Sequence, residues 1–399
     1  MKHLSNYFDI ILSILTDKPI KDISSISHQD WQQIIKISEY NYITPLIYYK
    51  LKRNNYLEQL PKTVISYLEN RYQYNCAINL KTSYELYNFI DLLNDLNIPC
   101  IILKGGYLAE KVYSNIGLRV LFDIDLLFHK QDLKKVQKIL EENKLRLRYL
   151  NLDFHWYLEQ FLDVPMEDVW NNADLIKIGE RNILSLCPEM LLIHLCIHTG
   201  LHHLFKVGGL RGLYDIKETI IYFKNKIDWD YVNVISKKWN VNECVYVALK
   251  LTDNLLGLPK NCKVKIKKVF SVNVDKELFE WAQKQLLSFH VGTYHTSKEL
   301  SLYYWKIWGS YSFKEKIKAF KRLLFPPEEI IFQKYYAEPG RLKNKKNYFK
   351  RIFQHIRPYA KMTWGILAGN EISVNELKRQ MEYDHFRKRL APNGKWIHR

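Results

Sequence analysis

The sequence predicts an α+β protein in which a small core of strands and helices lies between an N-terminal and a C-terminal helical region. Apolar residues recur at helical spacing in the first 97 positions, and this spacing returns after Pro188 and continues almost to the end of the chain. Between these regions the pattern changes to short apolar runs, which are typical of buried strands. With 399 residues, 47% of them hydrophobic, the chain can form two or three packed units.

We expect four segments along the chain. They are a helical region over residues 1–97, an α/β core over 98–180, a helical domain over 181–300, and a basic helical region over 301–399. In the first segment the apolar residues from Thr63 to Leu96 predict one long helix or two stacked helices.

The α/β core begins with an apolar run over 99–103 that ends at Lys104-Gly105-Gly106, which predicts a buried strand and a tight turn. Glycines let a backbone approach a ligand closely, and the free N–H groups at the start of the next helix suit a phosphate. The alternative is a simple turn. The rest of the core predicts, in order, a helix over 107–113, a strand over 120–128, an amphipathic helix over 132–143, and a strand or hairpin over 145–155.

The second predicted strand carries two aspartates, Asp123 and Asp125. Side chains alternate along a strand, so both carboxylates lie on one face. Two like charges repel and are costly to desolvate, and a divalent cation between them would remove that cost. Oxygen ligands of this kind suit Mg²⁺ or Mn²⁺. The alternative is a solvent-facing strand edge where both carboxylates are hydrated. Asp153 is the candidate third carboxylate, because an adjacent strand would bring it beside the pair.

The chain is strongly basic, with 60 Lys and Arg against 42 Asp and Glu and a net charge of +18. Residues 301–399 hold 22 basic and 8 acidic residues, so most of the excess lies there. A basic surface attracts nucleotides, RNA, DNA or an acidic membrane face; the alternative is a solvated lysine-rich surface. We expect no membrane insertion, because no apolar stretch approaches the ~18 residues of a spanning helix. Six scattered cysteines and no convincing signal peptide indicate a cytoplasmic protein.

These motifs together resemble the nucleotidyltransferase superfamily that shares the fold of DNA polymerase β. Its pattern is an apolar strand, a glycine turn, two acidic residues on the next strand and a third on a later strand. The chain is also similar to a bacterial family described as uncharacterised nucleotidyltransferases. The leucine-lysine-glycine turn of that family is present at residues 103–106, its R-x-x-x-DIDLL signature at 119–127, and an acidic-x-His-Trp segment at 153–156.

The resemblance implies transfer of a nucleoside monophosphate from an NTP, with ATP the expected donor, and release of pyrophosphate. Two Mg²⁺ or Mn²⁺ ions would be held by Asp123, Asp125 and Asp153.

The resemblance also implies that Gly105 and Gly106 hold the phosphates, with contacts from Lys104 and Arg119. Structural alternatives stay open for these two basic side chains. Arg119 would instead pair with a carboxylate, and Lys104 would only flank the turn.

A stripe of histidines follows Pro188, with His194, His198 and His202 at a spacing of four and His203 adjacent. Three alternatives are open: imidazoles packed between helices, imidazoles that line the cleft and contact the nucleotide, and a zinc site. The resemblance favours the second, which makes His194 and His198 nucleotide-binding candidates. Arg211 and Asp215 would belong to the same wall or form an ion pair with each other.

The acceptor is not revealed by the sequence, and a small molecule, sugar, peptide or protein would serve. One alternative is an enzyme that modifies RNA and binds it through the basic region 301–399. The others are a kinase-like phosphotransferase on the same fold and an inactive binding protein.

Overall fold

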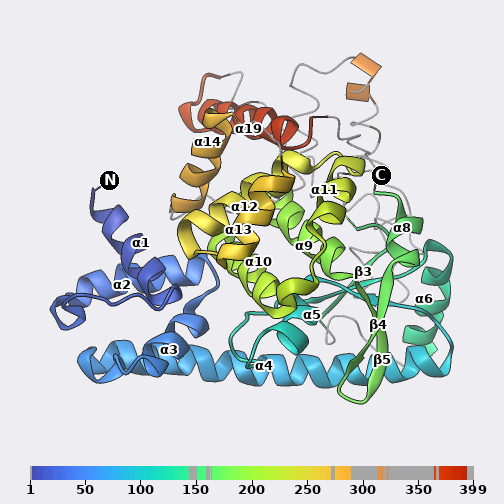
Figure 1. Ribbon diagram of the computed structural model, residues 1–399, viewed down its shortest axis with the longest axis horizontal. Helices are drawn as coiled ribbons and strands as arrows, with labels where there is room; N and C mark the ends of the chain where they lie inside the picture. Colours follow the sequence, from blue (N-terminus) through green and yellow to red (C-terminus); the bar gives the residue numbers. More distant parts are fainter. Residues whose placement is uncertain are drawn as a thin grey trace. The chain divides into compact units, whose positions relative to one another are not determined.

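The protein is described by a computed structural model that covers residues 2–142, 151–158, 162, 164–270, 275–288, 313–314, 316–317, 321, 364 and 368–392 (Figure 1). The chain forms two compact units. The first comprises Met1–Val136, Leu150–Phe289 and Leu390–His398, and the second comprises Gln137–Tyr149, His290–Arg389 and Arg399. All candidate site residues belong to the first unit. Most of the predicted basic region 301–399 lies outside the described residues.

The N-terminal region is helical, as the sequence predicts. Its helices are α1 (Lys2–Leu15), α2 (His28–Tyr40), α3 (Thr44–Arg53) and α4 (Lys62–Asp95). The apolar pattern that allowed one helix or two belongs to α4 alone, which begins directly after Pro61. Proline is favoured at this point because the first turn of a helix leaves its N–H groups unpaired.

The core is a mixed five-stranded sheet in the order β3-β2-β1-β5-β4. Its strands are β1 (Ile101–Ile102), β2 (Ile124–Leu127), β3 (Leu152–His155), β4 (Ala173–Ile178) and β5 (Arg181–Leu186). The β2–β3 and β1–β5 pairs are parallel, whereas β1–β2 and β4–β5 are antiparallel. The fold is therefore the predicted α+β arrangement of a mixed sheet flanked by helices.

One face of the sheet is apolar and packs against α4, which runs along the sheet in Figure 1. Phe89 of α4 stacks on Phe154 of β3 with ring centroids 5.6 Å apart, and Phe128 meets the same ring edge-on at 5.1 Å. Ile124 and Leu126 of β2 lie on this face and are buried. Because side chains alternate along a strand, the odd-numbered residues of β2 and β3 lie on the opposite face.

Helices return after β5 and surround the almost wholly apolar helix α9 (Pro188–Ile197). Nine of its ten residues are buried, as expected for a helix covered on every side. The other helices described are α5 (Lys104–Tyr107), α6 (Leu133–Glu142), α8 (Met166–Asn171), α10 (Gly209–Phe223), α11 (Trp229–Lys238), α12 (Asn242–Leu256), α13 (Lys260–Val269), α14 (Lys276–Leu287) and α19 (Glu371–Leu390).

The sheet differs from its sequence prediction in extent. Strand β2 begins at Ile124, not at residue 120, so Asp123 directly precedes it. The β4–β5 hairpin, for which we predicted no strands, continues the sheet to Leu186, past the expected domain boundary at residue 180. Residues 143–150 of the predicted helix and strand lie outside the described residues.

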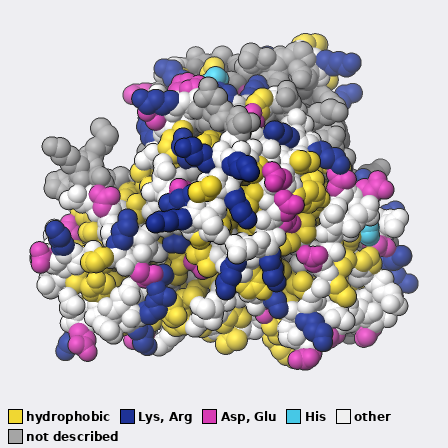
Figure 2. All heavy atoms as spheres, in the orientation of Figure 1, with side chains coloured by type: hydrophobic (Ala, Val, Ile, Leu, Met, Phe, Trp, Pro, Cys, Tyr) yellow, Lys and Arg dark blue, Asp and Glu magenta, His cyan; other side chains and the backbone are white. Residues whose placement is uncertain are grey.

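The surface of the first unit carries exposed lysines on α13 (Figure 2), namely Lys260, Lys263, Lys265, Lys267 and Lys268. None of the helices in the described ranges has both the length and the apolar composition needed to cross a bilayer. The six cysteines are free thiols.

Candidate active site

The parallel pairing of β2 and β3 brings the acidic residues together. Asp125 lies directly opposite Asp153, and Leu127 lies opposite His155. Asp123 precedes Asp125 by two residues, so its side chain lies on the same face. This polar face opposes the apolar face that packs on α4. The sheet register therefore places three carboxylates and one imidazole on one face of two adjacent strands.

Asp125, Asp153 and His155 form a cluster with the spacing of metal ligands. One ligand atom from each lies within 4.8 Å of the other two. The His155 Nε2 atom is 2.8 Å from Asp125 Oδ1 and 3.4 Å from Asp153 Oδ2. Carboxylate oxygens and an imidazole nitrogen are donors that Mn²⁺ accepts, and the carboxylates also suit Mg²⁺. The donor set therefore fits a divalent cation.

Lys104 supplies a positive charge to the same cluster. Its Nζ lies 3.1 Å from Asp125 Oδ1, and both side chains are almost fully buried. Burial alone would raise the pKa of Asp125, but Lys104 and the hydrogen bond from His155 hold it well below its ordinary value. Burial alone would lower the pKa of His155, but Asp125 and Asp153 raise it. Asp125 is thus held as a carboxylate by the Lys104 ammonium and the hydrogen bond with His155.

Asp123 experiences the opposite electrostatic balance. Its carboxyl reaches solvent, yet surrounding protein atoms remove part of its hydration. This burial, together with the negative charges of Asp125 and Asp153, raises its pKa to about 6. Asp123 lies near the cluster but outside the group of three with ligand spacing. A carboxylate repelled by two neighbours is a position where a cation would relieve the repulsion.

The glycine turn lies at the start of α5, directly after β1. Lys104 adopts the left-handed backbone region with φ +36°, which is strained for a residue with a side chain. A Cβ on Gly105 would collide with the Arg119 guanidinium, and one on Gly106 would lie 2.8 Å from Ile124. Internal packing therefore accounts for both glycines. The contact of this turn with phosphates stays a prediction.

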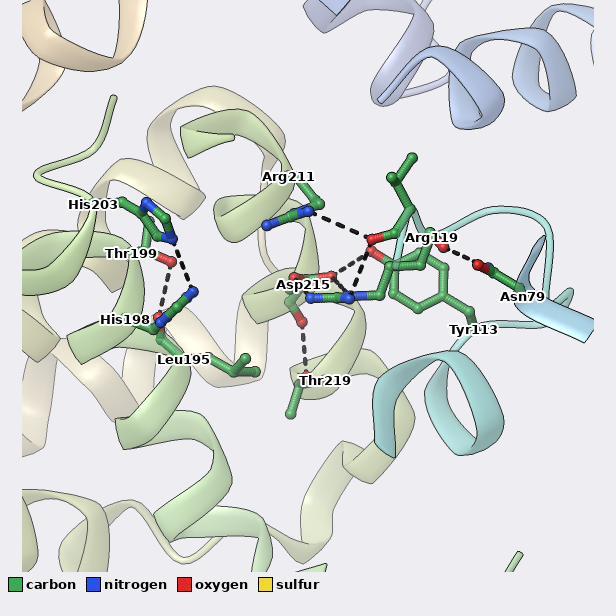
Figure 3. A network of polar contacts seen from close by, with 11 residues as sticks. Asn79, Tyr113, Arg119, Leu195, His198, Thr199, His203, Arg211, Asp215 and Thr219 are labelled. Carbon is green, nitrogen blue, oxygen red and sulfur yellow. Dashed lines mark hydrogen bonds and ion pairs between the residues drawn. The ribbon is translucent and has the colours of Figure 1, made fainter. Parts of the chain in front are cut away.

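Arg119 forms a buried ion pair with Asp215 of α10 (Figure 3). Its Nε and Nη2 donate to the two carboxylate oxygens at 3.0 Å, and the Tyr113 hydroxyl donates to Oδ1 at 2.7 Å. This is the carboxylate pair that the sequence left as an alternative for Arg119. Asp215 pairs with Arg119, and no ion pair of the described residues joins it to Arg211, so the ion-pair alternative for Arg211 and Asp215 has no support.

Two asparagines of α4 donate hydrogen bonds to the loop that carries Arg119. Asn79 donates from Nδ2 to the Ile116 carbonyl at 2.5 Å and to the Arg119 carbonyl at 2.7 Å. Asn75 donates to the Gly117 carbonyl at 2.8 Å. Because the Arg119 guanidinium also packs against Gly105, these hydrogen bonds connect α4 to the turn beside the acidic cluster.

The histidine stripe continues from α9 into the π-helical turn η5 (His198–His202). His194 is fully buried, while the His198 and His203 Nε2 atoms lie 3.0 Å apart (Figure 3). The charge of His198 contributes to the lowered pKa of Asp125, so this imidazole lies near the cluster. Within the described ranges no set of three histidines has ligand spacing, and the zinc alternative therefore has no support. Nucleotide contact by His194 and His198 stays a prediction.

The comparison with known families decides the class of the protein. Residues 27–257 match the family described as uncharacterised nucleotidyltransferase. The chain belongs to this nucleotidyltransferase family. The matched range includes the whole sheet, the acidic cluster, Arg119 and the histidines. Comparison with curated proteins and with solved structures gives no significant match.

This nucleotidyltransferase is therefore a transferase whose acidic cluster lies inside the family region. The sequence predicts Asp123 and Asp125 on one strand face with Asp153 on an adjacent strand, and the structure pairs Asp125 with Asp153 across β2 and β3. The sequence prediction missed His155 as a member of the cluster. The signal was present, because His155 follows Asp153 by two residues and must share its face of β3.

Proposed function

We propose that this nucleotidyltransferase is metal-dependent and has a polymerase-β-like core. It moves a nucleoside monophosphate from an NTP, with ATP the expected donor, to an acceptor hydroxyl. The new bond joins the acceptor oxygen to the α-phosphorus, the bond to the β-phosphate bridging oxygen breaks, and pyrophosphate leaves. The proposal rests above all on the convergence of Asp125, Asp153 and His155 on one sheet face inside the family region.

The residues of the chain supply charge and position to this reaction. Asp125 and Asp153 would hold the divalent ion, with Asp123 and His155 beside them. When bound, the ion would neutralise phosphate charge and favour ionisation of the acceptor hydroxyl. The Lys104 ammonium lies within 3.1 Å of Asp125, so it is placed where phosphates of the same substrate would arrive. The cluster lies on two paired strands, which hold its geometry rigidly.

Labelling with each α-labelled NTP, Mn²⁺ and a cell extract tests the proposal. We expect one acceptor to become labelled and pyrophosphate to form. Asp125→Asn and Asp153→Asn should each lower labelling at least a hundredfold, because each removes a metal-binding charge. Asp91→Asn is the matched control, since Asp91 is an acid on α4 that pairs with Arg181.

Two results would contradict the proposal. The first is formation of nucleoside diphosphate with no transfer of the α-label, together with labelling when a γ-labelled NTP is used instead, which marks a kinase. The second is full labelling by both cluster variants. Sensitivity of the labelled product to ribonuclease would identify RNA as the acceptor.

A further inference from the structure

Arg211, in the first turn of α10, is a cation outside the internal ion pairs of the described residues. Its guanidinium lies over the rings of Tyr42 and Phe122, at 5.1 and 5.8 Å from their centroids. Its polar contact is a long one, from Nη1 to the Val120 carbonyl at 3.5 Å (Figure 3). The Nε atom is buried without a hydrogen-bond partner, and across the described ranges no carboxylate forms an ion pair with Arg211.

Asp215, the carboxylate whose charge acts on Arg211, already binds other partners. Asp215 receives two hydrogen bonds from Arg119 and one from Tyr113. The region therefore contains two guanidinium groups for one carboxylate. Burial, followed by the charge of Arg119, lowers the pKa of Arg211 to about 10. An incompletely solvated cation beside another cation is costly, and an anion from solution would relieve that cost.

Arg211 contacts the segment of the chain that leads to the acidic cluster. Val120 and Phe122, which the guanidinium touches, belong to the segment that leads directly into Asp123. The two aromatic rings hold the guanidinium plane, so little side-chain entropy would be lost when its N–H groups bind an oxyanion. A planar fork of N–H donors matches phosphate oxygens.

We propose that Arg211 binds a phosphate group of the NTP substrate. The inference rests on the proposed function and deepens it, because it assigns a triphosphate contact to the helical domain. Arg119 holds Asp215 and thereby leaves Arg211 available for the substrate.

Binding of inorganic tripolyphosphate in the presence of Mg²⁺, measured by calorimetry, tests the inference without an acceptor. We expect Arg211→Met to weaken binding at least tenfold, because a charge-assisted contact is lost. Arg211→Lys should recover part of the affinity, since it keeps the charge but not the fork. Arg71→Met is the matched control, because Arg71 also lies over a tyrosine ring, that of Tyr74.

Thermal unfolding of the same variants separates binding from a structural role. Removal of a buried, unneutralised charge should leave the Tm of Arg211→Met unchanged or higher. Wild-type affinity in Arg211→Met would overturn the inference, as would a large fall in its Tm together with no recovery in Arg211→Lys. Failure of the wild-type protein to bind tripolyphosphate and ATP would instead overturn the proposed function.

Discussion

Asp123 shows how neighbouring charges at this site act on a single residue. Its carboxyl is repelled by Asp125 and Asp153, whereas Asp125 is neutralised by Lys104 and His155. Neighbouring carboxylates with such different surroundings are common at functional sites. The difference also has a consequence for stability that can be measured without a substrate.

Asp123→Asn should stabilise the metal-free protein at pH 7.5. The folded-state pKa is raised from 3.8 to about 6, so the folded state binds the proton more tightly than the unfolded state. The wild-type protein therefore loses stability from Asp123 as the pH rises through this range. We expect a gain of about 1 kcal/mol for the variant, reduced by solvent screening because the carboxyl is exposed.

Calorimetric Tm values between pH 4.5 and 7.5 provide the measurement. The difference between Asp123→Asn and wild type should shrink as the pH falls toward 4.5. A difference that stays constant over this range would show that the carboxyl is not repelled.

At the residue scale, the sequence predicts contacts that depend on local spacing and fails for those that depend on distant partners. Asp123 and Asp125 share a strand face by alternation alone. The partner of Arg119 is Asp215, which is 96 positions away, and nothing in the spacing distinguishes it from other carboxylates. The role of Gly105 also depends on Arg119 from another segment.

At the scale of elements, α4 supports the site through its asparagines. Asn79→Ala would remove the donor to the Ile116 carbonyl and the shorter of the two hydrogen bonds to the Arg119 carbonyl, which should cost about 2 kcal/mol. Urea unfolding measures this loss. Asn94→Ala is the matched control on the same helix, because Asn94 is exposed and should change stability by less than about 0.5 kcal/mol. Equal losses in both variants would contradict the anchoring role of Asn79.

Elements with strong periodicity are predicted well, whereas the bounds of the short strands β1 and β2 are predicted too wide. The apolar spacing of α4 extends over 34 residues, whereas β1 has only two residues and depends on its neighbours for pairing. The β4–β5 hairpin was missed although Gly179, with φ +57°, supplies the backbone conformation that a tight hairpin turn requires. Its strands combine exposed and buried positions without strict alternation, which hides them from a period-two search.

At the scale of the whole molecule, the net charge of +18 and the exposed lysines of α13 favour attraction of polyanions such as NTPs (Figure 2). The charge explains capture of an anion but not its reaction. The chemistry is assigned to one face of one sheet, where two parallel strands bring acidic residues from positions 123–125 and 153 together. The proposed reaction therefore depends on a divalent ion at that face.

Electron paramagnetic resonance of Mn²⁺, titrated into the full-length protein with ATP, tests this dependence directly. We predict that wild type binds Mn²⁺ and that Asp125→Asn and Asp153→Asn each weaken its binding at least tenfold, because each removes one ligand charge. Binding of wild-type strength in both variants would contradict the assignment of the metal to this cluster.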